Sequence, residues 1–329
     1  MSLTSSLPAV APPAARHRGD PRRVLQLALA AVWLLDGLLQ LQPSMFTPGS
    51  TGLGAMVGGT AAGNPGPVAH SIAWNASVVD HHAVVTNSAF ALIQILIGLG
   101  IAWRPALKPA LAASVVWSLA VWWFGEGLGG VLHGTGTPVG GGPGAVFFYA
   151  LLAVVLWPSE RAGDQPPFVA ARALGLPGAR AVWAVLWLGL GTLALLGQGR
   201  SADGLSSLVH GLYRGEPGWL AAVDRHAQSL LAQRGLACAV LVALICVAVA
   251  LGVFGPPVVA RAVVVLAVVT AAAIWVVGEN LGTILAGGAT DPNSGPLLIL
   301  LALCYWPPAP AGARAADRAA RAPAVVEVG

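Results

Sequence analysis

The segment W-W-F-G-E-G-L-G-G-V-L-H-G-T-G-T-P-V-G-G-G-P, from Trp122 to Pro143, decides how this chain is organised. It recurs from Trp275 to Pro296 as W-V-V-G-E-N-L-G-T-I-L-A-G-G-A-T-D-P-N-S-G-P, with ten identities at unchanged spacing. The identical pairs are Trp122/Trp275, Gly125/Gly278, Glu126/Glu279, Leu128/Leu281, Gly129/Gly282, Leu132/Leu285, Gly134/Gly287, Thr137/Thr290, Gly142/Gly295 and Pro143/Pro296. The chain is therefore a duplicated unit, and each copy carries what we call a GExLG segment.

Composition places the chain in the membrane. Of its 329 residues, 56% are hydrophobic and 9% are charged, whereas about 25% charged residues is usual for soluble proteins. The net charge of +4 does not indicate nucleic-acid binding, because the basic residues flank apolar segments and form no patch with aromatic residues. Cys238, Cys246 and Cys304 lie within apolar runs without CxxC spacing, so no disulfide or cysteine-based metal site is expected.

Apolar runs predict an all-α polytopic membrane bundle of about eight transmembrane helices. Each run approaches the ~20 residues that cross a bilayer. Four spans fall in each copy, so both copies cross in the same sense, as two parallel four-helix repeats. The expected spans are 24–42, 85–103, 107–125, 140–157, 181–197, 235–254, 258–277 and 291–307. We expect a first repeat at 24–157, a cytoplasmic linker at 158–180, a second repeat at 181–307, and disordered cytoplasmic ends at 1–23 and 308–329.

Lysine and arginine predict the orientation. Thirteen of them lie in the two ends, the linker and the two short turns, whereas four lie in the loop at 198–234 on the other face. The positive-inside rule then places both termini in the cytoplasm of a multi-pass plasma-membrane protein. Both GExLG segments are expected on the outer face. The first apolar run is interpreted as a retained helix and not a signal peptide, because Asp36 interrupts it and no small-residue cleavage site follows.

The duplicated acids Glu126 and Glu279 define the main candidate site. Each is expected at the outer end of the third helix of its repeat, before a Gly-rich stretch. Matching Gly- and Pro-interrupted segments in two halves point to a binding site in transporter-like folds. We predict that both acids, with the duplicated Thr137 and Thr290, bind a ligand or relay protons. Alternatively, the two carboxylates only accept hydrogen bonds from the backbone of the following helix.

The helix after each Gly-rich stretch is expected to begin at Thr137-Pro138 or at Asp291-Pro292, read as N-cap and first helical residue. The apolar part that follows is short in both repeats. The Gly-rich loops are therefore expected to dip below the membrane surface, which requires protein or a water-filled cavity around them.

A second duplicated pattern is Asp-x-His, which occurs at Asp80 with His82 and at Asp224 with His226. Carboxylate and imidazole are ligands for Zn, Fe, Mn or Cu, so these residues predict a divalent metal site beside the GExLG segments. The alternative is that each Asp caps the next helix and each His is an interfacial residue.

Asp36 lies within the first predicted span, whereas alignment of Trp33 with Trp187 places Leu190 at the equivalent position. An acid inside the membrane costs about 2.5–3.5 kcal/mol on insertion scales, so it is expected to face the bundle interior. Asp36 is interpreted as part of a proton or ion relay or as a buried hydrogen-bonding group.

The stretch W-L-L-D-G-L-L-Q-L-Q-P-S-M-F, from Trp33 to Phe46, resembles the DoxX/DoxD-like membrane modules. The compact four-span layout of each half, with a short basic turn after the second span, is similar as well. The resemblance implies four-helix units and a membrane subunit linked to quinone-dependent sulfur oxidation. No family motif in this sequence allows a catalytic residue to be placed.

Three functions remain open. The first is an outward-facing protein that binds or transports a small solute or metal ion. The second is a membrane subunit of a quinone-linked oxidoreductase, with a quinone or an extracytoplasmic protein as partner besides the lipid bilayer. The third is a scaffold or assembly protein that uses the loops 43–84 and 198–234. Haem is disfavoured because no His lies in mid-span, and the motifs of ATPases and common hydrolases are missing, which favours a role other than catalysis.

Overall fold

The computed structural model describes residues 20–159, 166–211 and 215–307, and this part of the chain is helical without a β-strand. Five helical segments are long and apolar enough to cross a membrane: Ala83–Ala102, Arg104–Phe124, Val169–Leu196, Gly235–Gly252 and Pro257–Gly278. The predicted class, a helical membrane bundle, is confirmed. The predicted disordered ends lie outside the described residues except for 20–23, where the first helix begins.

The two halves repeat the same order of elements. The first half contains α1 (Pro21–Leu39), η1 (Pro43–Phe46), α2 (Leu53–Gly59), α3 (Gly66–His81), α4 (Ala83–Ala102), η2 (Arg104–Ala106), α5 (Leu107–Phe124), η3 (Gly127–Gly130), η4 (Pro138–Gly140) and α6 (Ala145–Val155). The second half contains α7 (Val169–Leu196), η5 (Gln198–Arg200), α8 (Gly204–His210), α9 (Gly218–Leu231), α10 (Gly235–Gly252), α11 (Pro257–Ala273), η6 (Ile274–Gly278), η7 (Asn280–Ala286) and α12 (Ser294–Leu303).

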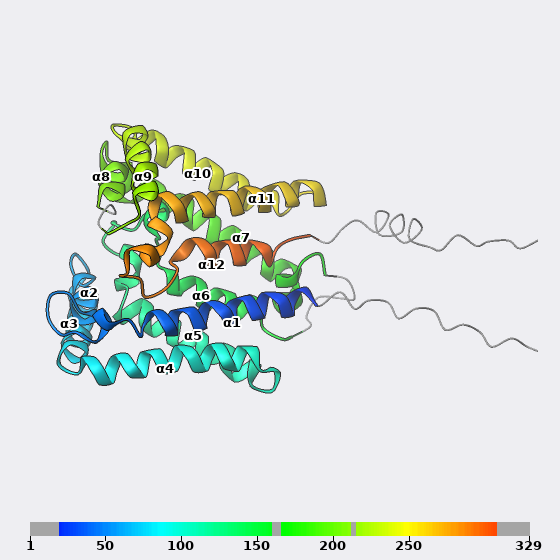
Figure 1. The fold of residues 1–329 in the computed structure, drawn as a ribbon. Coiled ribbons are helices and arrows are strands. Elements are labelled where there is room, and N and C mark those ends of the chain that lie inside the picture. The colour runs from blue at the N-terminus through cyan, green and yellow to red at the C-terminus, as the bar shows by residue number, and fades with distance from the viewer. Residues whose placement is uncertain (1–19, 160–165, 212–214, 308–329) are drawn as a thin grey trace, which may run out of the picture.

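Equivalent helices also pack in equivalent ways. Helix α1 packs along α4 and α7 along α10, while α5 packs on α6 and α11 on α12. The short helices α6 and α12 meet between the halves. Figure 1 shows the pair α2 and α3 at the same end of the bundle as α8 and α9, while α1 begins and α12 ends at the opposite end. The two halves therefore run in the same direction.

Tryptophan side chains inside the bundle donate hydrogen bonds through their indole N–H groups. Trp33 of α1 is 1% exposed, and its indole N–H donates to the Ser114 hydroxyl of α5 at 3.1 Å. In the second half, the indole of Trp183 donates to the carbonyl oxygen of Val249 at 2.8 Å. These bonds matter because water is not available in the hydrocarbon region to replace them.

Helices α6 and α12 are too short to span a bilayer alone. They contain 11 and 10 residues. At about 1.5 Å per residue, each helix covers roughly half of the ~30 Å hydrocarbon thickness. The Gly-rich loops supply the rest of each connection, so the predicted spans 140–157 and 291–307 are each a loop followed by a short helix. This arrangement fits the expectation that the loops lie deeper than the ends of the long helices.

The expected helix starts at Thr137 and Asp291 are wrong. Thr137 precedes only the short turn η4, which ends at Gly141 with a left-handed φ of 86°. Helix α6 begins after Gly144, whose φ is 114°. Helix α12 begins after Asn293, whose side chain accepts the backbone N–H of Ser294. The chain turns through these positive-φ residues and only then becomes helical.

Part of the predicted linker is folded. Helix α7 begins at Val169, and Gly175, with a φ of 72°, divides its first turns from the long span. The first turns lie against the end of α12: Ala170 donates its N–H to the Cys304 carbonyl at 3.0 Å, and Phe168 packs on Tyr305 at 5.1 Å between ring centroids. Residues 160–165 of the linker lie outside the described residues.

Candidate functional site

The two GExLG segments are followed by loops of different length. The indole of Trp122 donates to the carbonyl oxygen of Pro143 at 2.6 Å, and the indole of Trp275 makes the same bond to Pro292 at 2.9 Å. Pro143 is therefore equivalent to Pro292 and not to Pro296. The identities Gly142/Gly295 and Pro143/Pro296 do not mark equivalent positions, because the second loop is four residues shorter than the first.

The duplicated glutamates reach the start of the following short helix in both halves. Glu126 Oε1 accepts the backbone N–H of Val146 at 3.3 Å, in the first turn of α6. Glu279 Oε2 accepts the backbone N–H of Gly295 at 2.9 Å, in the first turn of α12. This position suits a carboxylate because the N–H groups of a first turn have no partners within the helix.

The second oxygens of these carboxylates differ. Glu279 Oε1 accepts the hydroxyl of Ser294, so both oxygens of Glu279 are used. Glu126 Oε2 is buried and finds no hydrogen-bond partner in the described part of the chain. Both copies of the repeat carry the same acid. Hydrogen bonds to the following helix and its first residue use both oxygens of Glu279 but only one oxygen of Glu126.

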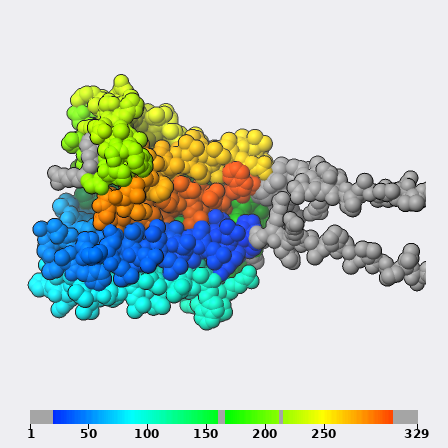
Figure 2. All heavy atoms as spheres, viewed as in Figure 1, coloured from blue at the N-terminus to red at the C-terminus, as the bar shows by residue number. Residues whose placement is uncertain are grey.

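Each loop crosses to the other half of the molecule. In the first loop, the carbonyl of Val139 lies against Gly278 so closely that a Cβ there would be 1.7 Å from the oxygen. In the second loop, the carbonyl of Ala289 accepts the Gln42 side chain at 2.7 Å. Figure 2 shows this part of the second half, in orange, lying against the first half, in blue. Thr137 consequently lies near Gly199 of η5, whereas Thr290 lies beside the first half.

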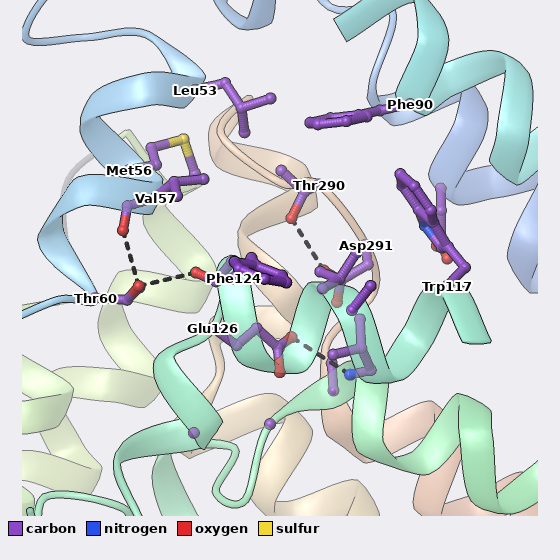
Figure 3. A pocket seen from close by; sticks show the side chains of 18 of the residues that line it. Leu53, Met56, Val57, Thr60, Phe90, Trp117, Phe124, Glu126, Thr290 and Asp291 are labelled. Atoms are coloured by element: carbon purple, nitrogen blue, oxygen red, sulfur yellow. Dashed lines mark hydrogen bonds between the residues drawn. The ribbon is translucent and has the colours of Figure 1, made fainter. Parts of the chain in front are cut away.

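A cavity of about 510 Å³ lies between the first half and the crossing second loop. Glu126 lines it together with Thr290 and Asp291 of the second loop (Figure 3). Asp36 of α1 lines it as well. An adjoining cavity of about 170 Å³ is also lined by Glu126, Thr290 and Asp291. The structure thus brings together Asp36, Glu126 and Thr290 of the predicted site. Glu279 lines neither cavity.

The ionisable groups that line the larger cavity are acidic. No Lys, Arg or His occurs among the described residues that line it. Asp36 is 2% exposed, and the Tyr149 hydroxyl interacts with its carboxyl group, but no hydrogen bond of regular geometry reaches its Oδ1 within the described structure. Burying an acid without a counter-charge is unfavourable. Leu190, the equivalent of Asp36, is also 2% exposed, so the second half has no acid at this position.

The acids of the two loops titrate closer to neutral pH than free carboxylic acids. Glu126 lies beyond the end of the span Arg104–Phe124; burial raises its pKa to about 8, and the nearby Asp291 raises it as well. Burial raises the pKa of Glu279 to about 7, against hydrogen bonds from Ser294 and Gly295 that lower it. Burial also raises the pKa of Asp291, while bonds from Asn293 and Thr290 lower it. Glu126 can therefore exchange a proton near physiological pH.

The residues of the predicted metal site are spread out. Asp80 Oδ1 accepts the backbone N–H of Gly49 at 2.6 Å, and His82 is exposed at the start of α4. Asp224 is fully buried, whereas His226 is exposed on the same helix. In the residues that the structure describes, no three His, Cys, Asp or Glu side chains are grouped as a metal ion would require.

Asp224 is linked to the second GExLG segment through Glu216. It lies beside Glu216, whose Oε2 accepts the Asn280 side chain at 2.6 Å. Asn280 directly follows Glu279 in the chain. Asp224 therefore belongs to a carboxyl pair that connects α9 to η7.

Sequence reasoning missed Asp291 as a cavity residue and also missed the aromatic side chains Phe90, Trp117 and Phe124 that line the cavity. Asp291 could have been found, because it is an acid present in only one copy of the loop, as Asp36 is in the first span. The aromatic residues carried no comparable indication, because aromatic side chains are common at membrane interfaces.

No protein-family model, curated protein or solved structure matches this chain.

Proposed function

We propose that this protein binds a small positively charged solute from the outer side of the plasma membrane, and that it does so as a binding or transport protein. The observation that carries the proposal is Asp36, which is 2% exposed, lines the cavity and has an oxygen without a hydrogen-bond partner in the described structure. A positive charge in the cavity would offset the unfavourable burial of this carboxyl group.

The other cavity acids support the same conclusion. Glu126 and Asp291 line the cavity with Asp36, and no basic side chain of the described chain shares it. Acids inside a membrane bundle generally mark ion or substrate sites. A cation would offset the unfavourable burial of these groups, whereas an anion would increase it.

The cavity reaches the end of the bundle that carries α2 and α3. Two of its lining residues, Met56 of α2 and Trp74 of α3, are 45% and 65% exposed. The uneven distribution of Lys and Arg supports an orientation with that end outside the cell and both termini in the cytoplasm. A solute would therefore enter from the outside.

A neutral quinone suits this cavity less well. It would leave the acids without a counter-charge, although the apolar walls would accept its ring. The DoxX/DoxD-like role and a metal site therefore remain predictions from the sequence, and the charge of the cavity favours the cationic solute.

The proposal can be tested by thermal unfolding of the purified protein in nanodiscs with sodium, potassium, manganese or small ammonium ions. We expect at least one cation to raise the unfolding temperature of the wild type. The shift should be lost in Asp36→Asn, which keeps the shape of the side chain and removes its charge, and kept in Glu279→Gln. Stabilisation by a ubiquinone analogue that survives Asp36→Asn, without any cation effect, would overturn the proposal.

A further inference from the structure

We infer that the solute is an organic ammonium ion with an apolar or aromatic substituent, and not a bare metal ion. This inference rests on the proposed function, because it names the class of cation that the same cavity accepts. Three properties of the cavity carry it: the chemistry of its walls, its size and the placement of its acceptors.

One wall of the cavity is aromatic. Phe90 of α4 and Trp117 of α5 meet edge to face with ring centroids 5.4 Å apart. Phe124, one of the last residues of α5, lies closer to Glu126 in the same view (Figure 3). Aromatic faces attract ammonium groups, and the attraction grows where water is excluded. They also bury the carbon substituents of a ligand, which a hydrated metal ion does not have.

The opposite wall is aliphatic. Leu53, Met56 and Val57 of α2 face the aromatic wall across the cavity (Figure 3). A methionine side chain adapts to ligands of different shape, because it is unbranched and has three rotatable bonds. The site therefore provides apolar contact on two sides and acid groups between them.

The cavity is larger than a bare ion needs. The volume of about 510 Å³ falls in the range of roughly 300–1,000 Å³ found for small-molecule sites. A metal ion instead needs several ligand atoms at about 2.0–2.6 Å. The described residues do not group three side chains of the usual ligand types.

The acceptors are placed for an N–H-bearing cation. Gln94 of α4 lines the cavity, and its carbonyl oxygen Oε1 is buried without a hydrogen-bond partner in the described structure. Together with Asp36 and Glu126 it offers acceptors from α4, α1 and the loop after α5. An ammonium group donates hydrogen bonds and carries no acceptor, so it matches a cavity whose acids and amide oxygen offer acceptors.

The test uses benzylammonium as the probe, with benzyl alcohol as its neutral counterpart and sodium and manganese as inorganic cations. Binding to the full-length protein in nanodiscs is measured by calorimetry. We expect benzylammonium to bind and benzyl alcohol to bind at least about tenfold more weakly. Trp117→Leu and Phe124→Leu should each weaken benzylammonium by roughly 2- to 30-fold, the range of a cation–π contact.

Trp123→Leu is the matched control, because Trp123 is an aromatic neighbour on α5 that does not line the cavity and donates to Ser71 instead. It should leave the affinity unchanged. Phe124 is 37% exposed, so its substitution keeps the aromatic test available if Trp117→Leu does not fold.

The outcomes separate the two proposals. If sodium or manganese binds in a manner that depends on Asp36 while benzylammonium does not bind, the organic cation is excluded and cation binding stands. If no cation binds in a manner that depends on Asp36, both proposals fail. If benzyl alcohol binds as tightly as benzylammonium, or if the aromatic variants bind like the wild type, the inference is overturned.

Discussion

Asp36 of α1 and Glu126 of the loop after α5 line the same cavity, although 89 residues separate them along the chain. Their equivalents in the second half are Leu190, which has no charge, and Glu279, whose oxygens are both hydrogen-bonded. The two halves therefore differ at this cavity while keeping one order of α-helices. The first half holds the cavity, and the second half contributes a loop that lines it.

We predict that both GExLG loops face the outside of the cell. Leu132 is 52% exposed, and Gly288 has open space around the position of a Cβ. Cysteine at either position should react with a membrane-impermeant thiol reagent in intact cells. The background should carry Cys238→Ala, because the native Cys238 is only half-buried.

The control for this labelling is Lys108→Cys, in the short turn region at the opposite end of the bundle, where Lys108 is exposed. It should react only after lysis. Labelling of Lys108→Cys in intact cells, with protection of the other two, would reverse the orientation and the side from which the solute enters.

We predict that Glu279→Gln lowers stability more than Glu126→Gln. A glutamine at 279 keeps one acceptor for two donors, the hydroxyl of Ser294 and the N–H of Gly295, so it should destabilise the fold by about 1–3 kcal/mol. At 126, one oxygen can still accept the N–H of Val146, and a buried charge is removed. Unfolding temperatures in detergent would compare the two variants, and equal losses would contradict their different roles.

We predict that affinity for a cation rises with pH through about 8. Burial raises the pKa of Glu126 to about 8, and the deprotonated form is the one that attracts a cation. The titratable groups around it are Asp291 of the second loop, Asp36 of α1 and Tyr149 of α6. Calorimetry between pH 6 and 9 would measure the trend, and Glu126→Gln should flatten it; a steep pH dependence in that variant would assign the titration to another group.

We predict that the docking of α9 weakens as pH rises. Burial and the neighbouring Glu216 raise the pKa of Asp224 to about 7 from its ordinary 3.8. Because the pKa of Asp224 is higher in the folded state, its protonated carboxyl group contributes to folding stability. This contribution is fully present below about pH 4 and is lost as pH rises towards 7. Hydrogen exchange of α9 at different pH values would reveal the change. In the Asp224→Asn variant, the exchange of the α9 amides should not change with pH once the intrinsic pH dependence of exchange is corrected for.

We predict that Gly144→Ala disrupts the first GExLG loop. Gly144 has a φ of 114°, and a Cβ there would lie 2.1 Å from Glu126 Oε2, so the substitution should cost at least about 2 kcal/mol. Gly288→Ala is the control, since its Cβ would meet no atom within 4 Å. Similar unfolding temperatures for the two variants would show that the Glu126 carboxylate is not held where the structure places it.

Much of the fold could be predicted because long apolar runs are local properties of the chain. The expected spans 85–103 and 107–125 correspond to α4 (Ala83–Ala102) and α5 (Leu107–Phe124), and 235–254 corresponds to α10 (Gly235–Gly252). The starts of α6 and α12 could not be predicted in this way. They follow positive φ angles at Gly144 and Asn293, in loops that Trp122 and Trp275 bind through the carbonyl oxygens of Pro143 and Pro292.

The candidate site could be predicted in part. Asp36 was recognised because an acid is rare within an apolar span, and Glu126 because the repeat keeps it; both line the cavity. Asp291 joins them only because the second loop crosses to the first half, where Ala289 accepts the side chain of Gln42. No pattern within a single repeat contains that contact.

The sequence by itself determined that this chain is a duplicated helical membrane bundle, because the length of apolar runs and the repeated spacing are local properties of the sequence. Only the tertiary structure decided which of the two duplicated glutamates faces a cavity. That outcome depends on a loop four residues shorter in the second half, on the crossing of the loops and on the closed hydrogen bonding of Glu279. These are relations between distant segments, and packing determines them.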